Sequence, residues 1–506
     1  MQNNSNVAKA SIILIIGAIL SKVLGFAREL LVAYKFGAGS ISDAFILTNA
    51  IPSILFVTFA TAIKINYIPY YHRLKTQEEK NRFTSNLMNL CLVSLFIGCL
   101  IVSFCSRKVL KIFAAGFPAD TEYYAVIMLR IVVFSIIPII LSYLFQAYLQ
   151  ANKMFVSTAL YGVVINVVVI AATILATKDT HYVLSIGTLV SHFVGLFLIL
   201  YFVKQKTSFH YEPYINPKDD LIKGIVLLTL PLMLENFASS MSLLVGRNLA
   251  SFLDKGTISG LSYAGTIGNI ASTMIATSIM TSTFPLFSQL IAENRKEEFV
   301  LQFIKYASVI SYILAPLSLF MMVNALDIVV LIFEHGAFSR SSTIIVMECL
   351  VCYTVGVLPM ALQTYLIRGF YAMQDTKTPV KIKVFALFLN IALNLATVKF
   401  FAHKGIALST SISYLVAYFL LLNALKHKHD LQSIDEITRE ALSSLTIAIV
   451  PAVLCYGLFR FFLVIDNLLL KIVFEGFIFF GLFMLMLSIF KKSVFKEVLK
   501  LVKQCK

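Results

Sequence analysis

His181-Tyr-Val-Leu-Ser-Ile-Gly-Thr-Leu-Val-Ser191 recurs 222 residues later as His403-Lys-Gly-Ile-Ala-Leu-Ser-Thr-Ser-Ile-Ser413. Extended to residues 181–200 and 403–422, the two stretches share seven identities. A second echo joins residues 150–166 to 374–390 at an offset of 224. The sequence therefore indicates two copies of one structural unit.

The composition predicts an all-α polytopic membrane protein. The 506 residues are 59% hydrophobic and 13% charged, whereas soluble domains are roughly 45–50% apolar and about 25% charged. The apolar residues also gather in blocks of about 20, the length of a membrane-spanning helix. Soluble enzymes, secreted scaffolds and disordered proteins are excluded as classes.

We expect about fourteen spanning helices. They are predicted at 10–34, 43–70, 83–105, 122–148, 156–176, 182–203, 222–252, 258–290, 301–325, 342–371, 380–400, 404–425, 441–462 and 468–490. The repeat divides them into two six-helix lobes and two extra C-terminal helices. Because six is even, the copies share one orientation and a pseudo-two-fold axis along the membrane normal. Transporters built in this way rock two lobes around a central site.

The predicted domain boundaries follow from this plan. A first lobe (helices 1–6) covers 1–203, a cytoplasmic linker 204–220, a second lobe (helices 7–12) 221–425, and helices 13–14 with a basic cytoplasmic tail 426–506. The net charge of +16 gives the orientation, because basic residues favour cytoplasmic loops. The side of the termini carries 24 of the 42 lysines and arginines and the opposite side 9, so both termini are predicted to be cytoplasmic.

Soft metal ligands give no confident site. Cys349 and Cys352 have the spacing of redox or zinc motifs, but they lie in an apolar run without other such ligands. We expect them to pack as small apolar residues. The sequence predicts no metal centre and no catalytic residue.

Basic residues inside apolar segments are the main candidate site. Lys22 and Arg28 lie in the first predicted helix, Lys64 in the second and Arg247 in the seventh. Intramembrane charges usually line water or contact a partner, although snorkelling or a structural ion pair would also explain them. A cationic cavity favours an anionic substrate, and guanidinium binds phosphate in a bidentate manner.

A second candidate is a cluster of uncharged polar residues. Asn390 and Asn394 lie one turn apart on the eleventh helix, and Thr410 lies on the twelfth. Amide and hydroxyl oxygens could hold a cation such as Na⁺. Hydrogen bonding between the two helices is the alternative.

Several strings resemble the MurJ/MviN family of lipid II flippases, over about residues 9 to 425. They are Ser21-Lys-Val-Leu-Gly-Phe-Ala-Arg28-Glu29, Phe36-Gly-Ala38, Ser42-Asp43-Ala-Phe45, Arg247-Asn-Leu-Ala-Ser251, Gly256-Thr-Ile-Ser259, Ser262-Tyr-Ala264, Phe333-Glu-His-Gly-Ala-Phe338 and Phe370-Tyr-Ala-Met-Gln-Asp-Thr-Lys-Thr-Pro-Val380. The resemblance implies a two-lobed transporter of the multidrug/oligosaccharidyl-lipid/polysaccharide superfamily.

The same resemblance implies the activity and its residues. The family moves an undecaprenyl-diphosphate-linked peptidoglycan precursor from the inner to the outer leaflet of the bacterial plasma membrane by alternating access. Arg28 matches its key first-helix arginine, Lys22 a nearby basic position and Asp43 its acidic position at the start of helix 2. The implied partners are the lipid-linked glycan, membrane lipids and other cell-wall synthesis proteins, and no nucleic acid.

The chain departs from the family pattern at two arginine positions. Pro52 is followed by Ser-Ile-Leu-Phe56-Val57, where many relatives carry an arginine pair, and Tyr263-Ala264 is followed by Gly-Thr266 in place of an arginine. We hypothesise that Lys64, together with Arg247, partly replaces these ligands.

The family's sodium site also lacks its acids. Its positions fall on Asn390, Asn394, Ile406 and Thr410, and its helix 7 acid aligns with Gly246. Without a carboxylate we expect weak sodium coupling at most. The membrane potential could then supply the drive, about 2.3 kcal/mol per charge per 100 mV.

Three alternatives remain at this point. One is a flippase for another undecaprenyl-linked glycan, such as a capsule, teichoic or O-antigen-like unit. A drug/cation antiporter fits less well, because the intramembrane charges are mostly basic. A membrane glycosyltransferase needs paired acids, and the candidate outer-loop acids of the first lobe, Asp120, Glu122 and Asp179, form no such motif.

Overall fold

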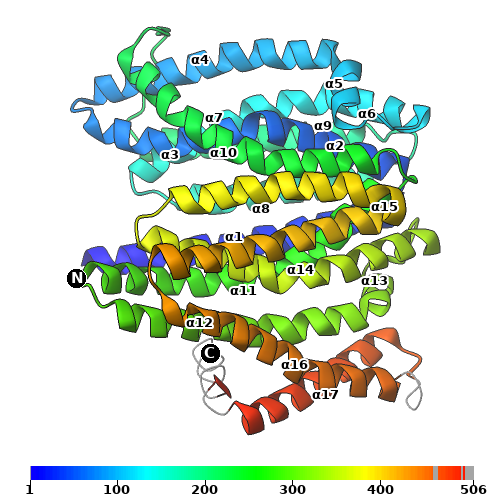
Figure 1. Cartoon of the computed structure of the whole chain (residues 1–506). Helices are drawn as coiled ribbons and strands as arrows, with labels where there is room; N and C mark the ends of the chain where they lie inside the picture. The colour runs from blue at the N-terminus through cyan, green and yellow to red at the C-terminus, as the bar shows by residue number, and fades with distance from the viewer. Residues whose placement is uncertain (1, 460–464, 492–493, 496–506) are drawn as a thin grey trace. The chain divides into compact units, whose positions relative to one another are not determined.

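The computed structural model describes residues 2–459, 465–491 and 494–495, and their regular structure is helical (Figure 1). The α-helices are α1 (Gln2–Phe36), α2 (Ser40–Pro52), α3 (Thr58–Arg73), α4 (Gln77–Phe104), α5 (Ser106–Phe113), α6 (Ala119–Val132), α7 (Ile136–Ala151), α8 (Val156–Leu175), α9 (Val183–Lys206), α10 (Asp220–Ala250), α11 (Thr257–Ala292), α12 (Lys296–Val323), α13 (Ala325–Phe333), α14 (Arg340–Ala372), α15 (Lys377–Lys428), α16 (Glu436–Gly457) and α17 (Leu468–Phe490). Short turns of π-helix (Ser53–Val57) and 3₁₀-helix (Val133–Ser135, Gln432–Asp435) complete them.

The helices confirm the predicted all-α polytopic class. Within the described ranges, ten helical segments are long and apolar enough to cross a membrane. Their outward faces carry bare aromatic side chains, such as Phe104, Phe400 and Phe477, which are 84%, 81% and 79% exposed. Such exposure is unfavourable in water and favourable in lipid. The count of fourteen spanning helices stays a prediction.

Two predicted spans are interrupted next to prolines. The predicted helix 43–70 consists of α2, a π-turn and α3, and the break follows Pro52. The predicted helix 122–148 consists of α6, a 3₁₀ turn and α7, and Pro138 lies just after that turn. A proline cannot donate to the carbonyl four residues earlier and its ring crowds that carbonyl. The carbonyl four residues before Pro138 belongs to Phe134, so the helix changes its pitch there, within the 3₁₀ turn.

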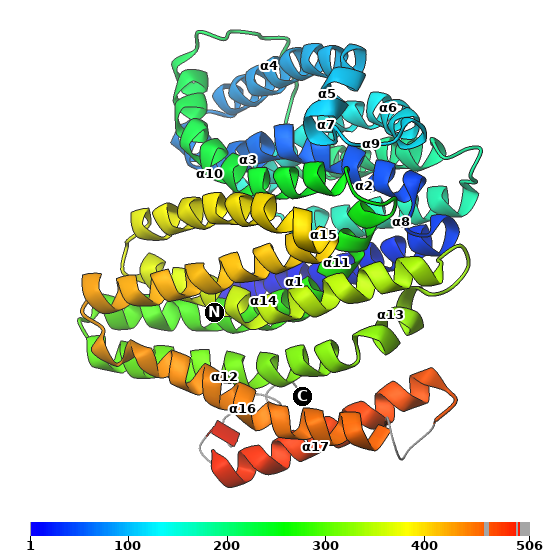
Figure 2. The same ribbon diagram turned by 45° about the vertical axis from the view of Figure 1, so that its right-hand side comes forward.

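The turn predicted between residues 400 and 404 lies inside α15. Ala402 has φ 47° and ψ −128°, so it breaks the helical path. Figures 1 and 2 show the two arms of α15 as separate helices joined at this point. Positive φ is uncommon for alanine, and here one such residue is enough to join two long helices.

The chain forms two compact units. One contains residues up to Ser259 together with Gly336–Phe338, and the other contains Gly260–His335 and the rest of the chain from Ser339. Helix α10 packs against α3 inside the first unit. The lobe boundaries 1–203 and 221–425 were derived from the sequence repeat. They remain a prediction, because the compact units are defined by contacts and not by the repeat. Most of the predicted basic tail lies outside the described residues.

Small residues bring α1 and α8 into close contact in the first unit. The contact residues are Gly17, Ser21 and Gly25 of α1 and Ala159, Gly162 and Asn166 of α8. A Cβ on Gly17 would lie 2.6 Å from the Cβ of Ala159. The Asn166 amide donates to the Ser21 carbonyl over 3.0 Å. Such small-residue stripes let backbones approach in membranes, and this one fixes how α1 is rotated.

The predicted linker is bound to α4 along its length. Residues 207–219 connect α9 to α10 in an extended path. The Asn86 side chain accepts from the Asn216 backbone N–H at 2.7 Å and donates to its carbonyl at 3.0 Å. Asn89 donates to the Tyr214 carbonyl at 3.1 Å. The segment is therefore a strap held by polar groups on one face of α4.

Candidate functional site

Helix α1 carries two of the predicted cations on different faces. Lys22 and Arg28 are six residues apart, which at 100° per residue places them about 120° apart around the helix. Lys22 is exposed, whereas the Arg28 side chain is 32% exposed and lies 3.9 Å from Glu29. The Gly17–Ser21–Gly25 stripe that contacts α8 lies close to Arg28 around the helix. The packing of α1 therefore determines where the guanidinium points.

Lys64 lies on α3 and contacts only neutral groups of α7. Its Nζ donates to Gln146 Oε1 at 2.9 Å and lies 5.5 Å from the centre of the Tyr143 ring. The Gln146 side chain is buried at 3% exposure, and Lys64 is half-buried. In the described part of the chain, no carboxylate lies within ion-pair distance of Lys64. The ammonium charge therefore has no neutralising partner there.

Arg247 is a half-buried cation in the last turn of α10. A cation in this position is favoured by the helix macrodipole. The next residue, Asn248, donates to the Ile112 carbonyl over 2.8 Å. Arg247 therefore lies at the end of α10, which contacts α5 within the first unit.

Asp43 is buried and receives donors from the start of α11. Its Oδ2 accepts from the Gly256 backbone N–H, and its Oδ1 accepts from the Ser259 backbone N–H and hydroxyl, each over 2.7 Å. The first N–H groups of a helix have no partner within the helix. A carboxylate there is favoured by both hydrogen bonding and the helix dipole. Asp43 therefore caps α11 from the first turn of α2. The sequence predicted Asp43 as a substrate-site residue and did not predict this capping role.

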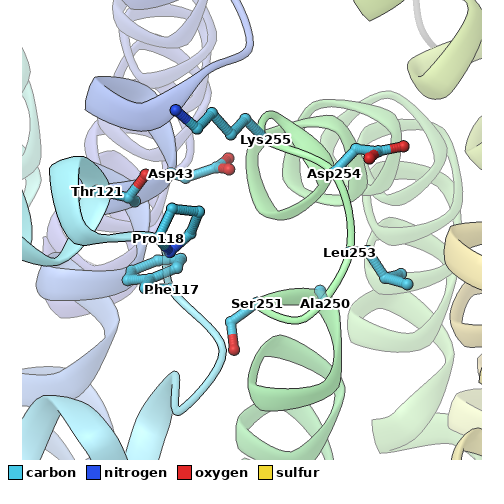
Figure 3. A pocket seen from close by; sticks show the side chains of 9 residues that line it. All are labelled: Asp43, Phe117, Pro118, Thr121, Ala250, Ser251, Leu253, Asp254 and Lys255. Atoms are coloured by element: carbon cyan, nitrogen blue, oxygen red, sulfur yellow. The ribbon is translucent and has the colours of Figure 1, made fainter.

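A small pocket lies beside this cap. Figure 3 shows Asp43, Thr121 and Lys255 around the same opening, with Phe117 and Pro118 forming a wall. The remaining lining residues are Ala250, Ser251, Leu253 and Asp254. The sequence predicts that this end of the first unit lies on the side of the membrane opposite the termini.

Further polar contacts close the same end. Lys255 pairs with Asp120 over 2.6 Å, and the Ser40 hydroxyl donates to the same carboxylate over 2.9 Å. The hydrogen bond from Lys255 holds the pKa of Asp120 below its usual value. The Gly116 backbone N–H donates to the Ser251 hydroxyl over 3.0 Å. Asp43 and these contacts together connect α2, α6 and the α10–α11 turn.

The predicted cation cluster is brought together on the two arms of α15. The Asn394 amide donates to Asn390 Oδ1 over 3.0 Å, and the Asn390 amide lies 3.5 Å from the Thr410 hydroxyl. Asn394 Oδ1 is buried and has no hydrogen-bond partner in the described residues.

These residues do not fit a sodium cage. Hard cations need several oxygen ligands, usually with a carboxylate among them. Asn390 Oδ1 already accepts a hydrogen bond from Asn394, and the Thr410 hydroxyl donates to the Ile406 carbonyl. The described residues contain no group of three acidic, histidine or cysteine side chains suited to a metal. Between the two arms, these residues make one long contact, from the Asn390 amide to the Thr410 hydroxyl at 3.5 Å.

One charged cluster was not found by sequence reasoning. Glu348 of α14 accepts from His403 and Lys404 of α15, each over 2.8 Å. The acid and the two basic residues are 55 and 56 positions apart, so no local motif joins them. They follow directly on the Ala402 break, and the pairing fixes the turn between the two arms of α15.

Comparisons with known proteins agree with the fold. The family described as "Lipid II flippase MurJ" matches residues 32–475. The "Probable lipid II flippase MurJ" of Buchnera aphidicola subsp. Baizongia pistaciae is 28% identical over 435 residues, which cover 83% of each chain. The "Lipid II flippase MurJ" of Burkholderia cenocepacia is 26% identical, over 81% of this chain and 82% of its own.

Solved structures share the architecture. A lipid II flippase MurJ in an inward closed conformation superimposes with a TM-score of 0.82 at 24% identity, covering 96% of this chain and 99% of its own. An inward-facing MATE family transporter of the MOP superfamily has a TM-score of 0.69 at 14% identity, covering 84% and 99%. At these identities the likeness concerns the fold.

Proposed function

Because the chain belongs to the MurJ family of lipid II flippases, we propose that it moves lipid II from the inner to the outer leaflet of the bacterial plasma membrane. Lipid II is a peptidoglycan precursor carried on undecaprenyl diphosphate, so the protein serves cell-wall synthesis and cell shape. Its work is transport, and no bond of the substrate is made or broken. The substrate tail stays in lipid while the diphosphate and sugars cross through protein.

Lys64 supports a diphosphate site most directly. The amide and the aromatic ring beside this ammonium are neutral, so neither cancels its charge. A buried charge is costly unless it is paired, and a phosphate oxygen supplies that pairing. Arg28 is only loosely paired, at 3.9 Å from Glu29, and can bind phosphate in a bidentate manner. In this proposal Arg28 and Lys64 hold the diphosphate, while Lys22 and Arg247 add positive potential.

Asp43 acts at the gate in this proposal. Its bonds to Gly256 and Ser259 hold one end of the first unit closed. Alternating access requires that end to open after the substrate has bound from the other side. The cap on α11 therefore has to break once in each cycle.

The orientation and the driving force are also proposals. The excess of basic residues on the side of the termini supports a cytoplasmic location for both termini. The poor fit of Asn390, Asn394 and Thr410 to sodium leaves the membrane potential as the drive. A net charge that moves with the substrate or with the cationic helices gains about 2.3 kcal/mol per 100 mV.

The test is replacement of the native gene by a repressible copy, with lipid II measured at the outer leaflet. We expect depletion to retain lipid II in the inner leaflet and cells to lose shape and lyse. Normal lipid II export together with loss of a surface polysaccharide would instead identify a flippase for another undecaprenyl-linked glycan. The missing arginines after Pro52 and Ala264 are the observation that keeps this second function in view.

A further inference from the structure

Lys64 differs from Lys404, Lys471 and Lys491 in the charge of its partner. Lys471 pairs with Asp327 and Lys491 with Glu440, each over 2.6 Å. Lys404 pairs with Glu348 over 2.8 Å. Each of these ammonium groups is neutralised by a carboxylate, and each pair is a structural contact between helices. Lys64 instead donates to a neutral amide.

Gln146 is the neutral partner that leaves Lys64 without a counter-charge. It is 3% exposed, and its Oε1 lies 2.9 Å from Lys64 Nζ. A glutamate has the same length and shape as a glutamine, so a carboxylate would fit the same place. It would form a half-buried ion pair with Lys64 and cancel the charge. The amide orients the ammonium without neutralising it.

The remaining donors of Lys64 are available to a ligand. An ammonium carries three N–H donors, and among the described residues one is used, by Gln146. The Tyr143 ring, 5.5 Å away, stabilises the cation on another side without accepting a full hydrogen bond. Neutral groups therefore hold the Lys64 ammonium on one side, and its other donors remain for a ligand.

We propose that Gln146 is a specificity-determining residue, which orients Lys64 and leaves its charge unneutralised for an anionic oxygen of the lipid-linked substrate. The proposal rests on the proposed function and adds the residue that sets the charge of its site. Gln146 acts through Lys64 and does not itself contact the substrate. The anionic oxygen can belong to the diphosphate or to a carboxylate of the attached peptide.

Gln146→Glu in the full-length protein, purified into lipid nanodiscs, tests this role. Binding is measured for lipid II and for undecaprenyl diphosphate without sugar or peptide. We expect affinity for lipid II to fall at least about tenfold, since one charge-assisted hydrogen bond is lost. The melting temperature should stay equal or rise, because the variant gains an ion pair. Loss with both probes identifies the diphosphate as the ligand, and loss with lipid II alone identifies the peptide.

Gln150→Glu is the matched control. It adds the same charge one turn further along α7, where Gln150 contacts Thr158 and not Lys64, and should leave binding unchanged. An equal loss in this control would show a general effect of added negative charge and overturn the proposal. Unchanged affinity of Gln146→Glu for both probes would also overturn it.

Two more variants separate the possible failures. Lys64→Gln removes the same ammonium without adding a charge, so it remains decisive if Gln146→Glu does not fold. Retained affinity in Lys64→Gln overturns the inference. Arg28→Ala tests the proposed site independently. If Arg28→Ala loses binding while Gln146→Glu binds normally, the role of Gln146 is refuted and the proposed diphosphate site stands. If both variants bind normally, the proposed diphosphate site is refuted as well.

Discussion

The Asp43 carboxylate accepts a hydrogen bond from the Gly256 backbone N–H over 2.7 Å, although 213 residues separate them in the chain. Gly256 has φ +91°, and a Cβ there would lie 2.6 Å from the Ala38 carbonyl oxygen. Only glycine therefore allows the α10–α11 turn to approach the α1–α2 turn this closely. The cap on α11 depends on that approach.

Asp43→Asn should weaken this cap and impair transport. The amide NH₂ of asparagine would face N–H donors that the carboxylate now accepts, so one or more bonds would be lost. We expect a loss of about 1.5–3 kcal/mol in the contact, the value of a hydrogen bond to a charged group. Transport assays in a depleted strain and thermal unfolding of the purified variant measure the two effects.

Ser259→Ala is a milder change to the same contact and is compared with Asp43→Asn. It removes the hydroxyl donor and leaves both backbone donors in place. Its effect on transport should be smaller than that of Asp43→Asn. Equal transport by wild type and Asp43→Asn would contradict a role for the cap in the cycle.

Arg28→Ala should abolish transport while leaving the fold intact. Of the two groups proposed to hold the diphosphate, Arg28 and Lys64, only the guanidinium can bind a phosphate in a bidentate manner, and its loss should lower substrate affinity about 100-fold. Arg340→Ala is the matched control, because Arg340 pairs with Glu334 at the exposed start of α14. Lipid II export in cells measures both variants, and export supported by Arg28→Ala would refute the site.

The sequence predicted the fold better than the site, for a physical reason. Apolar blocks and an internal repeat are local signals, so the all-α class and the turn near Ala402 were visible. The cap formed by Asp43 joins residues 213 positions apart, and the Lys64–Gln146 contact joins residues 82 apart. Such contacts depend on which faces of the helices meet, and composition does not record that.

Gly356→Ala should destabilise the second unit. A Cβ at Gly356 of α14 would lie 2.9 Å from the Cα of Ser411 on α15, so the two helices would have to separate. We expect a cost of about 1–3 kcal/mol from overpacking. At Gly265 the nearest atom would lie at 3.8 Å, so Gly265→Ala should be neutral, or stabilising by up to about 1 kcal/mol. Thermal unfolding compares the two, and equal melting temperatures would show that α14 and α15 are not in close contact.

Asp375→Asn should destabilise the α14–α15 connection throughout the range from pH 5 to 8. Burial raises the pKa of Asp375, but hydrogen bonds from Lys428, Thr378 and His429 outweigh it and hold the pKa well below its usual value. The stability from a lowered pKa is fully present above the unfolded value of about 3.9, and is lost as the pH falls through the folded value.

The cost of Asp375→Asn should be about 1–3 kcal/mol. Thermal unfolding at pH 5, 6.5 and 8 measures it against wild type. Lys428→Ala is the comparison, since the Lys428 side chain is 54% exposed and its pair with Asp375 should contribute about 1 kcal/mol or less. A destabilisation by Asp375→Asn that shrinks between pH 8 and pH 5 would place the titration of the carboxyl near neutrality and contradict the prediction.

Sodium should have little effect on this protein, and a single substitution should create a response. Asn390 Oδ1 is occupied by the Asn394 amide, and no carboxylate completes the cluster in the described residues. Replacing Na⁺ by K⁺ at constant ionic strength should leave transport and melting temperature unchanged, whereas collapse of the membrane potential should slow transport.

Asn394→Asp supplies the missing carboxylate next to Asn390 and Thr410, so its melting temperature should rise with Na⁺ but not with K⁺, because a bound ion stabilises the folded state. A sodium-dependent rise in the wild type would show that amide and hydroxyl oxygens alone bind the ion, and the proposed drive would then have to include it.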